Sequence, residues 1–231
     1  MSQPAANPFL DPELAVRFAA GAIELLRAEP SLERVQDLAR TAIYYADHCL
    51  ARLEADQPLP QPLACEAGCD ACCHNQIELT APEALLLGSF LEARFSPEQL
   101  QELRQQAEHS LARRAGLSKT QVAAQRAQHP CPLLHVHRCL AYEARPLVCR
   151  AMHSLDAAAC FQELADPLHP VVPFYSHRQI VYVSLSHGLA QVCRVFSLQA
   201  GPLDLAQVLV VMAGQPEAME QWLSGAAVFG G

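Results

Sequence analysis

The stretch QPLPQPLACEAGCDACCH, residues 57–74, interrupts a chain whose flanking sequence is patterned as helices. It begins with three prolines, which lack the N–H that a helix interior needs, and continues into Cys65, Cys69, Cys72 and Cys73. The sequence therefore predicts a loop between helical pairs, and this loop carries four thiols that could wrap around a metal ion.

Amphipathic helices are predicted on both sides of this loop. Apolar residues recur at spacings of three and four over residues 11–30, 31–57, 81–95 and 97–116. Helix start signals accompany the pattern, because a side-chain oxygen at the first position can accept a hydrogen bond from the first turn. These signals are Asp11, Thr80 with Glu83, Ser96 with Gln99, and Ser118 with Gln121.

A second irregular segment, residues 129–173, is rich in proline and histidine. After it, residues 176–199 are predicted to form a helix rather than a strand, and the tail is predicted to contain helices within 203–214 and 215–229. We expect an all-α or mainly α fold. The prediction is one irregular helical domain over residues 1–231, with an N-terminal helical pair (1–60), a cysteine-cluster region (61–162) and a C-terminal helical region (163–231).

Composition and charge exclude several classes of protein. Hydrophobic residues make up 51% and charged residues 17% of the chain, as in folded proteins rather than disordered ones. The net charge is −8 and the 16 Lys and Arg residues form no basic stripe, so nucleic acid is not an expected partner. No signal-peptide pattern opens the chain, and the apolar stretch at 205–214 has 10 residues, well short of the roughly 20 that cross a bilayer. We expect a cytoplasmic protein without a membrane contact.

The meaning of the ten cysteines depends on this expected compartment. Disulfides are rare in a reducing cytoplasm, so clustered thiols there indicate metal binding or redox chemistry. Thiolates suit zinc or an iron–sulfur cluster and exclude calcium and magnesium. Eight cysteines fall in the two irregular segments and are the candidate ligands: Cys65, Cys69, Cys72, Cys73, Cys131, Cys139, Cys149 and Cys160. We therefore expect the two Pro- and Cys-rich loops to converge on a metal site.

The other two cysteines, Cys49 and Cys193, lie in helical patterns, where a free thiol usually behaves as a small buried hydrophobe. Four histidines lie near the thiols: His74, His135, His137 and His153. Each is a ligand candidate, but a histidine beside a metal site is more often a hydrogen-bonding neighbour. We retain His74 and His153 as reserve ligands.

The spacing of the first cluster leaves the number of metal sites open. Cys65, Cys69 and Cys72 can point into one hollow, whereas Cys73 leaves the chain in another direction. Adjacent thiols therefore indicate either two neighbouring metal sites or one ligand beside one packed thiol. The same spacing occurs in radical S-adenosylmethionine enzymes, but those enzymes use a (β/α) barrel, and no alternating strand–helix pattern is present here.

Taken together, CEAGCDACC and the later CPLLHVHRCLAYEARPLVCR resemble the YkgJ-type cysteine-cluster family of zinc- or iron-chelating domains. The family pattern covers residues 63–160 and falls on the following positions: Cys65, Cys69, Cys72, Cys73, Cys131, Cys139, Tyr142, Glu143, Arg145, Pro146, Cys149 and Arg150, with Cys160 as the eighth thiol. The resemblance implies a metal site. Flagellin lysine N-methylases share the cysteine pattern, but the glycine-rich turn by which ordinary methyltransferases bind S-adenosylmethionine is missing here.

Two arginines within this pattern have alternative roles. Arg145 and Arg150 could offset the negative charge of a thiolate site and lower the pKa of its thiols. Alternatively, both could form surface ion pairs with Glu143, each contributing about 0–1 kcal/mol. Tyr142, Arg145 and Arg150 are accordingly candidates for the surroundings of the metal.

Two functions follow from these observations. The first is a metal-binding protein in which about eight cysteines hold an iron–sulfur cluster or Zn(II) and the metal contributes folding energy. The second is a redox or group-transfer enzyme, because eight thiols exceed the four of one closed site. We favour iron–sulfur, with zinc binding during aerobic preparation. No sequence feature supports a particular protein or small-molecule substrate. No sequence feature supports a partner-binding role of the acidic surface either.

Overall fold

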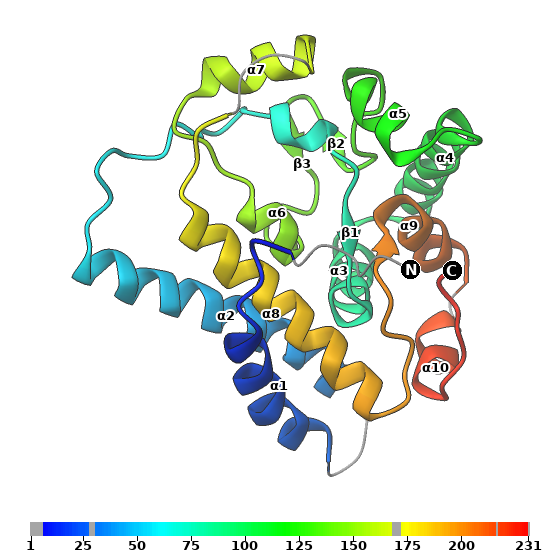
Figure 1. The fold of residues 1–231 in the computed structure, drawn as a ribbon. Helices are drawn as coiled ribbons and strands as arrows, with labels where there is room; N and C mark the ends of the chain where they lie inside the picture. Colours follow the sequence, from blue (N-terminus) through cyan, green and yellow to red (C-terminus); the bar gives the residue numbers. More distant parts are fainter. Residues whose placement is uncertain (1–6, 28–30, 168–171, 216, 231) are drawn as a thin grey trace, which may run out of the picture.

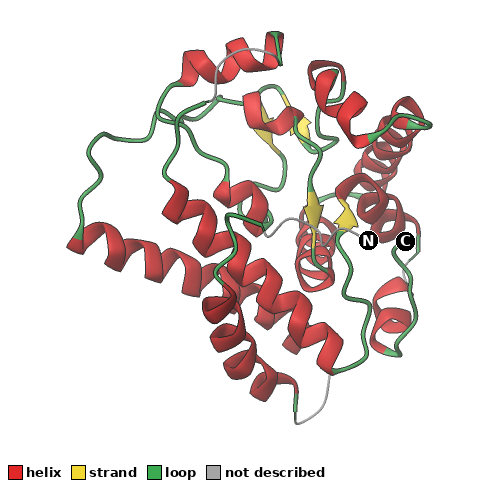
Figure 2. Ribbon diagram, in the orientation of Figure 1, coloured by secondary structure: helices red, strands yellow, loops and turns green. Residues whose placement is uncertain are grey.

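Helix α8 (Ser176–Val195) lies at the centre of the larger helical group in the computed structural model (Figure 1). The structure describes residues 7–27, 31–167, 172–215 and 217–230. Helices α1 (Pro12–Leu26) and α2 (Leu32–Asp56) pack against α8, and α2 also contacts α3 (Ala81–Arg94). On the other side of the molecule α4 (Pro97–Arg114) packs against α9 (Leu205–Gly214). The prediction of a mainly helical fold is confirmed (Figure 2).

The helices begin at the predicted start signals. The side chain of Asp11 accepts hydrogen bonds from the backbone N–H groups of Glu13 and Leu14 at the start of α1. Capping boxes formed by Ser96 with Gln99 and by Ser118 with Gln121 lie at the starts of α4 and α5 (Lys119–Ala124). The helix predicted over 11–30 ends at Leu26, and its residues 28–30 lie outside the described residues.

Residues 129–173 are more regular than predicted. They contain a hairpin of β2 (Leu134–His135) and β3 (Arg138–Cys139), followed by α6 (Leu147–Ala151) and α7 (Ala157–Ala165), while residues 168–171 lie outside the described residues. The prediction of an irregular segment was wrong here because elements this short contain too few residues to show a hydrophobic period. The first cysteine loop likewise ends in a short 3-10 turn, η1 (Ala71–His74), and a second such turn, η2 (Arg126–Gln128), follows α5.

The C-terminal part also departs from the predicted helices in detail. Strand β4 (Leu203–Asp204) pairs antiparallel with β1 (Glu78–Leu79), so α9 begins two residues later than the predicted 203–214. The predicted helix over 215–229 is reduced to α10 (Ala218–Leu223), and Pro216 lies outside the described residues. The β1–β4 pair places α9 next to the strand that leaves the first cysteine loop.

The close contact of α8 with α1 depends on a glycine. A Cβ atom at Gly188 would lie 2.8 Å from Cδ1 of Phe18 and 2.9 Å from the carbonyl oxygen of Ala15. Both distances are too short for a side chain, so glycine at this position lets the two helix backbones approach.

The buried carboxyl of Glu83 joins α3 to α6. One carboxyl oxygen accepts hydrogen bonds from the N–H and hydroxyl of Thr80, at 2.8 and 2.6 Å, as the predicted capping box requires. The other accepts a 2.7 Å hydrogen bond from the backbone N–H of Leu147, the first residue of α6. The capping residue of α3 therefore also fixes the position of the helix that carries Cys149.

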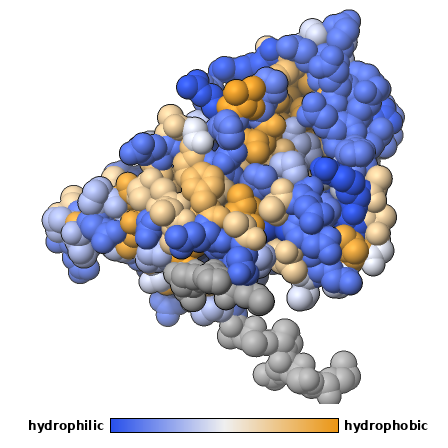
Figure 3. All heavy atoms as spheres, turned by 90° about the horizontal axis from the view of Figure 1, so that it is seen from above, coloured by the Kyte–Doolittle hydropathy of each residue, from blue (hydrophilic) through white to orange (hydrophobic). Residues whose placement is uncertain are grey.

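The face seen from above is mainly hydrophilic, with apolar patches between the hydrophilic regions (Figure 3). Among the described helices, none combines the length and the apolar character that a bilayer-spanning segment needs.

Candidate metal centre

The eight candidate thiols lie on short segments at one end of the molecule, in the region of η1, the β2–β3 hairpin, α6 and α7 (Figure 1). Cys65 and Cys69 precede η1, which itself carries Cys72 and Cys73. Cys131 precedes the hairpin and Cys139 is its last strand residue, whereas Cys149 lies in α6 and Cys160 in α7. Cys65 and Cys72 are exposed and the other six are half-buried.

Two hydrogen bonds join the first cysteine loop to the hairpin segment. The backbone N–H of Cys131 donates to the carbonyl oxygen of Cys73 at 2.8 Å. Nδ1 of His137, at the hairpin turn, lies 2.8 Å from a carboxylate oxygen of Asp70. The two cysteine-rich segments are thus held side by side by groups other than the thiols.

Arg126 of η2 joins α7 to the same region. Its Nη1 donates to Oδ1 of Asn75 and its Nη2 donates to Oε2 of Glu163, both at 2.8 Å. Asn75 follows η1 directly, and Glu163 lies one turn after Cys160. The guanidinium therefore holds α7 and its thiol against η1.

The thiols divide into two sets by the charges that act on them. Burial raises the pKa of both Cys69 and Cys160, and the charges of Cys65 and Cys72 act on both in the same direction. The charge of Cys160 also raises the pKa of Cys69. Because Coulomb interactions weaken with distance, these shared effects link the four thiols as one electrostatic set.

The second set surrounds Cys131 and Cys139. Burial raises the pKa of Cys131 to about 12 and raises that of Cys149, and the charge of Cys139 adds to both effects. The charges of Cys131 and Cys139 also act on Cys73. Cys72 acts on members of both sets, since its charge also raises the pKa of Cys131, Cys139 and Cys149.

The eight candidate thiols are near one another, but they do not form a metal coordination sphere. In the part of the chain that the structure describes, no three His, Cys, Asp or Glu side chains are arranged closely enough to hold a metal ion. Each buried thiol whose pKa is raised favours its protonated form, and a thiol must lose its proton before it binds a metal. The described side chains therefore lie around a common region without closing on one point.

Residues 64–166 match the family model described as "CxxCxxCC: Putative zinc- or iron-chelating domain". This segment, the CxxCxxCC domain, is similar to that family. The match contains all eight candidate thiols and agrees with the predicted span of 63–160. No curated protein and no solved structure matches the chain. The match supports binding of a metal by this region, with zinc and iron as the metals that the family description names.

Cys72 and Cys73 form the most strongly coupled pair of the CxxCxxCC domain. A hydrogen bond between the two side chains lowers the pKa of Cys72 to about 7 and raises that of Cys73. Cys73 thus holds its proton and donates it toward the Cys72 sulfur, which is the better thiolate of the two. The positive charge of Arg145 also lowers the pKa of Cys72.

Arg145 and Arg150 have different surroundings. The Arg145 guanidinium lies 4.0 Å over the ring of Tyr142, and its charge lowers the pKa of Cys72 and opposes the burial that raises that of Cys139. Its Nε is buried without a hydrogen-bond partner among the described residues. Of the two sequence hypotheses for Arg145, these contacts favour charge compensation at the thiols.

The guanidinium of Arg150 instead donates hydrogen bonds to the protein backbone. It donates to the carbonyl oxygens of Arg145 and Glu143, at 3.1 and 2.8 Å, and lies 3.9 Å from a carboxylate oxygen of Asp47. The Glu143 carboxylate pairs with Arg94 at the surface, at 2.6 Å. The surface ion pair considered for Glu143 is therefore present, but its partner is Arg94 and neither of the two arginines in the motif.

The two reserve histidines differ in the same way. His153 lies with Nδ1 2.7 Å from the carbonyl oxygen of Ala151, and its Nε2 accepts a 2.9 Å hydrogen bond from the N–H of Tyr175. Both ring nitrogens of His153 are thus used within the protein. Nδ1 of His74 is buried and has no partner among the described residues, so of the two reserve histidines His74 is the one with a ring nitrogen free to take a ligand.

The two cysteines outside the irregular segments lie in helices. Cys193 is buried in α8, where burial raises the pKa of its thiol to about 12, and Cys49 is half-buried in α2. Both pack with the hydrophobic core, as their helical patterns predict.

Three residues that organise the region were missed by sequence reasoning: Asp70, Arg126 and His137. Asp70 lies between two thiols and Arg126 is the second residue after a short helix, and nothing in their local sequence distinguishes them from surface charges. His137 was considered as a ligand, yet it ties the hairpin to Asp70. Such contacts form between segments far apart in the chain, so no local pattern reveals them.

Proposed function

We propose that the CxxCxxCC domain binds metal through eight thiolates in two four-cysteine groups. Group 1 consists of Cys65, Cys69, Cys72 and Cys160. Group 2 consists of Cys73, Cys131, Cys139 and Cys149. Four thiolates complete either a tetrahedral zinc site or the ligand set of an iron–sulfur cluster.

The observation that carries this proposal is the different surroundings of Cys69 and Cys73, which lie four positions apart. The charges of Cys131 and Cys139 raise the pKa of Cys73. The charges of Cys65, Cys72 and Cys160 raise the pKa of Cys69. Cys72 reaches both sets electrostatically, and we assign it to group 1 because group 2 already has four members. The adjacent thiols would then belong to two neighbouring centres, which is one of the two alternatives left open by the sequence.

The residues around the thiols suit an anionic centre. Four thiolates on a divalent metal carry a net negative charge, which needs nearby positive charge or N–H donors. Arg145 supplies a charge that acts on both Cys72 and Cys139, and its buried Nε lacks a partner among the described residues. When bound, the metal would hold together segments that few apolar contacts join, and this is folding energy.

Metal analysis of variants tests the two groups. We expect full-length protein purified without oxygen to contain two equivalents of zinc, or iron and sulfide for two clusters. Cys72→Ser and Cys160→Ser should each remove the same half of the metal, and combining them should remove no more. Combining Cys160→Ser with Cys73→Ser should remove both halves.

Cys49→Ser is the matched control, because this half-buried thiol lies outside both groups and its substitution should leave the metal content unchanged. A single metal equivalent lost equally with Cys72→Ser and Cys73→Ser would replace the two centres by one. Unchanged metal content in Cys73→Ser would make Cys73 a packed thiol.

A second candidate function, a redox or group-transfer enzyme, is favoured by a cavity beside the thiol segments. Asn75, Met152 and Glu163 line it, and each lies three or fewer positions after a candidate ligand. A redox-active cluster should show visible absorption that bleaches on reduction, whereas colourless protein saturated with zinc would rule out this function.

We also propose that the chain is one cytoplasmic domain. Apolar residues from Phe18 to Phe229 belong to one core cluster, which spans the N-terminal, cysteine-rich and C-terminal regions. Thiolate ligands need a compartment that keeps them reduced. The net charge of −8 disfavours nucleic acid as a partner. Limited proteolysis that releases a stable fragment would contradict the single domain.

A further inference from the structure

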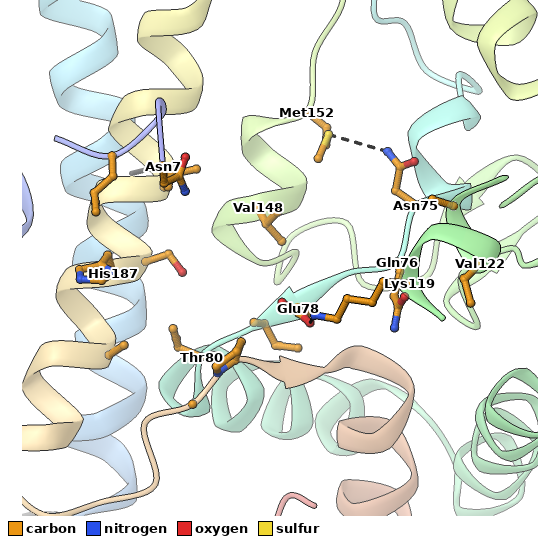
Figure 4. Close-up of a pocket in the computed structure, with 18 of the residues that line it drawn as sticks. Asn7, Asn75, Gln76, Glu78, Thr80, Lys119, Val122, Val148, Met152 and His187 are labelled. Carbon is orange, nitrogen blue, oxygen red and sulfur yellow. Dashed lines mark hydrogen bonds and ion pairs between the residues drawn. The ribbon is translucent and has the colours of Figure 1, made fainter. Parts of the chain in front are cut away.

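A cavity of about 1110 Å³ lies between α8, α6, α5 and the strand β1 (Figure 4). Figure 4 shows His187 on the α8 side, Val148 and Met152 on the α6 side, and Lys119 and Val122 on the α5 side. None of the ten cysteines lines the cavity. The proposed metal ligands are therefore not part of the cavity wall, although Asn75, Met152 and Glu163 in that wall lie close to them in sequence.

One face of α8 forms a wall of this cavity. The lining residues of α8 are Val183, Ser186, His187, Ala190 and Arg194, which recur at spacings of three and four. The opposite face of α8, with Tyr182, Leu185 and Leu189, is buried against the neighbouring helices. The cavity-facing stripe has short apolar and polar side chains, so α8 offers space there.

The charges of the lining leave one cation uncompensated. Lys119 pairs with Glu78 at 2.6 Å and Arg126 pairs with Glu163 at 2.8 Å, and all four residues belong to the lining. Arg194 has no carboxylate partner within the described part of the chain. Its charge also acts on His187, whose pKa is lowered first by burial and then by Arg194. The α8 wall thus presents one positive charge and a neutral imidazole near neutral pH.

The apolar part of the lining lies along the helix from this charge. Val183 and Arg194 are 11 positions apart, which is about 16 Å along a helix axis at 1.5 Å per residue. Between and opposite them lie Ala190, Val148 and Met152. We propose that the cavity binds an amphipathic organic anion, with its acidic group at Arg194 and its apolar body along α8 toward α6. An arginine suits a carboxylate, sulfonate or phosphate group equally in charge.

Two fluorescent probes that differ in charge test this proposal on the full-length, metal-loaded protein. The anion is 8-anilinonaphthalene-1-sulfonate, and N-phenyl-1-naphthylamine is an uncharged probe of similar aromatic body. We expect each to bind with one saturable site. Arg194→Gln should weaken the anionic probe about tenfold, the order expected for a lost charge-assisted hydrogen bond, and leave the uncharged probe unchanged.

Two substitutions, one on each of two walls, test whether the probes occupy the cavity by filling it with a large side chain. Ala190→Trp on α8 and Ala123→Trp on α5 should each abolish the binding of both probes. Ala123 is exposed, so a tryptophan there enters the cavity without disturbing the core, and this variant keeps the test valid if Ala190→Trp fails to fold. Arg17→Gln, on the exposed side of α1, is the matched charge control and should bind both probes as the unsubstituted chain does.

Three results would overturn the proposal. Unchanged binding of the anionic probe to Arg194→Gln would remove the acidic-group assignment. Unchanged binding to the folded Ala123→Trp variant would place the probes elsewhere on the surface. Absence of saturable binding by either probe would remove the site.

Discussion

The backbone N–H of Cys131 donates a 2.8 Å hydrogen bond to the carbonyl oxygen of Cys73. This bond joins the end of the first cysteine loop to the start of the hairpin segment. We expect it to be one of the contacts that metal binding strengthens, because thiolates from both segments would then be fixed around the same centres.

Metal removal should therefore loosen the cysteine segments and spare the helical core. After anaerobic chelation, hydrogen exchange of the backbone amides in residues 65–74 and 131–139 should accelerate by at least tenfold, as expected when local opening becomes easier. The buried face of α8 packs against α1 and α2, and these three helices carry none of the eight candidate ligands, so the amides of α8 should stay protected. Equal acceleration in α8 would show that the metal holds the entire fold.

Cys72 should be the first thiol of groups 1 and 2 to react in the metal-free, reduced protein. Its pKa is lowered to about 7, and its residue is exposed. Because the thiolate is the nucleophile, its alkylation rate should rise with pH through about 7 and level off above it. Cys131, whose pKa is raised to about 12, should react only in strongly basic solution.

Peptide mapping after brief iodoacetamide treatment measures this order. Arg145→Gln should move the Cys72 profile to higher pH, because it removes a charge that favours the thiolate. Arg94→Gln is the control, since this arginine pairs with Glu143 at the surface. An unchanged profile in Arg145→Gln would contradict the electrostatic role of Arg145.

The ion pair of Arg114 with Asp204 should stabilise the fold above acidic pH. Its two contacts are 2.7 and 3.0 Å, and both side chains are largely buried. Burial acts to raise the pKa of Asp204, but the hydrogen bonds from Arg114 and Gln76 outweigh it and hold that pKa below the ordinary 3.8. A lowered carboxyl pKa contributes stability that is present above 3.8 and lost as the pH falls through the folded-state value.

Two substitutions of Asp204 separate its two roles, because its side chain also caps α9 through the N–H groups of Ala206 and Gln207. Asp204→Asn keeps a good cap and should lower the free energy of unfolding by about 2 kcal/mol at neutral pH. Asp204→Ala should cost about 1 kcal/mol more. Urea denaturation at pH 7 and pH 3 measures both, and an equal loss for Asp204→Asn at the two pH values would contradict the linkage.

The hairpin turn should be stabilised by replacing Val136. Val136 and His137 have φ values of 45° and 59°, a left-handed conformation that a β-branched side chain adopts poorly. The Val136 side chain is 75% exposed, so its removal costs little packing. Val136→Asn should raise the free energy of unfolding by about 0.5–1 kcal/mol in thermal or urea denaturation. A loss of stability instead would indicate that the valine makes a contact in the metal-bound protein.

Two glycines, Gly188 in α8 and Gly21 in α1, should respond oppositely to substitution by alanine. Gly188→Ala would press a Cβ against Phe18 and the Ala15 carbonyl and should cost about 1–3 kcal/mol. Gly21 lies in α1 with no atom within 4 Å of the added Cβ, so Gly21→Ala should gain about 0.5–1 kcal/mol in helix propensity. Melting temperatures of the two variants measure the contrast, and equal shifts would contradict the tight α1–α8 contact.

Sequence patterns predicted the long elements because those elements repeat one periodic pattern over many residues. Helices α1 to α4 and α8 follow their amphipathic spacing and begin at side chains that satisfy free backbone N–H groups, such as Asp11 and Ser96. The short hairpin, α6 and α7 were not predicted, since tertiary hydrogen bonds such as that from Leu147 to Glu83 fix them.

The sequence by itself determined that the protein is mainly helical and that residues 63–160 carry a cysteine pattern similar to zinc- or iron-chelating domains, because periodicity and thiol spacing are local properties. Only the tertiary structure decided which distant groups meet. It joined the backbones of Cys73 and Cys131 by a hydrogen bond and placed the Arg145 guanidinium over the Tyr142 ring. It also used both nitrogens of His153 within the protein and left a cavity along one face of α8. These relationships depend on how helices and loops pack in three dimensions. A local pattern of residues therefore does not reveal them.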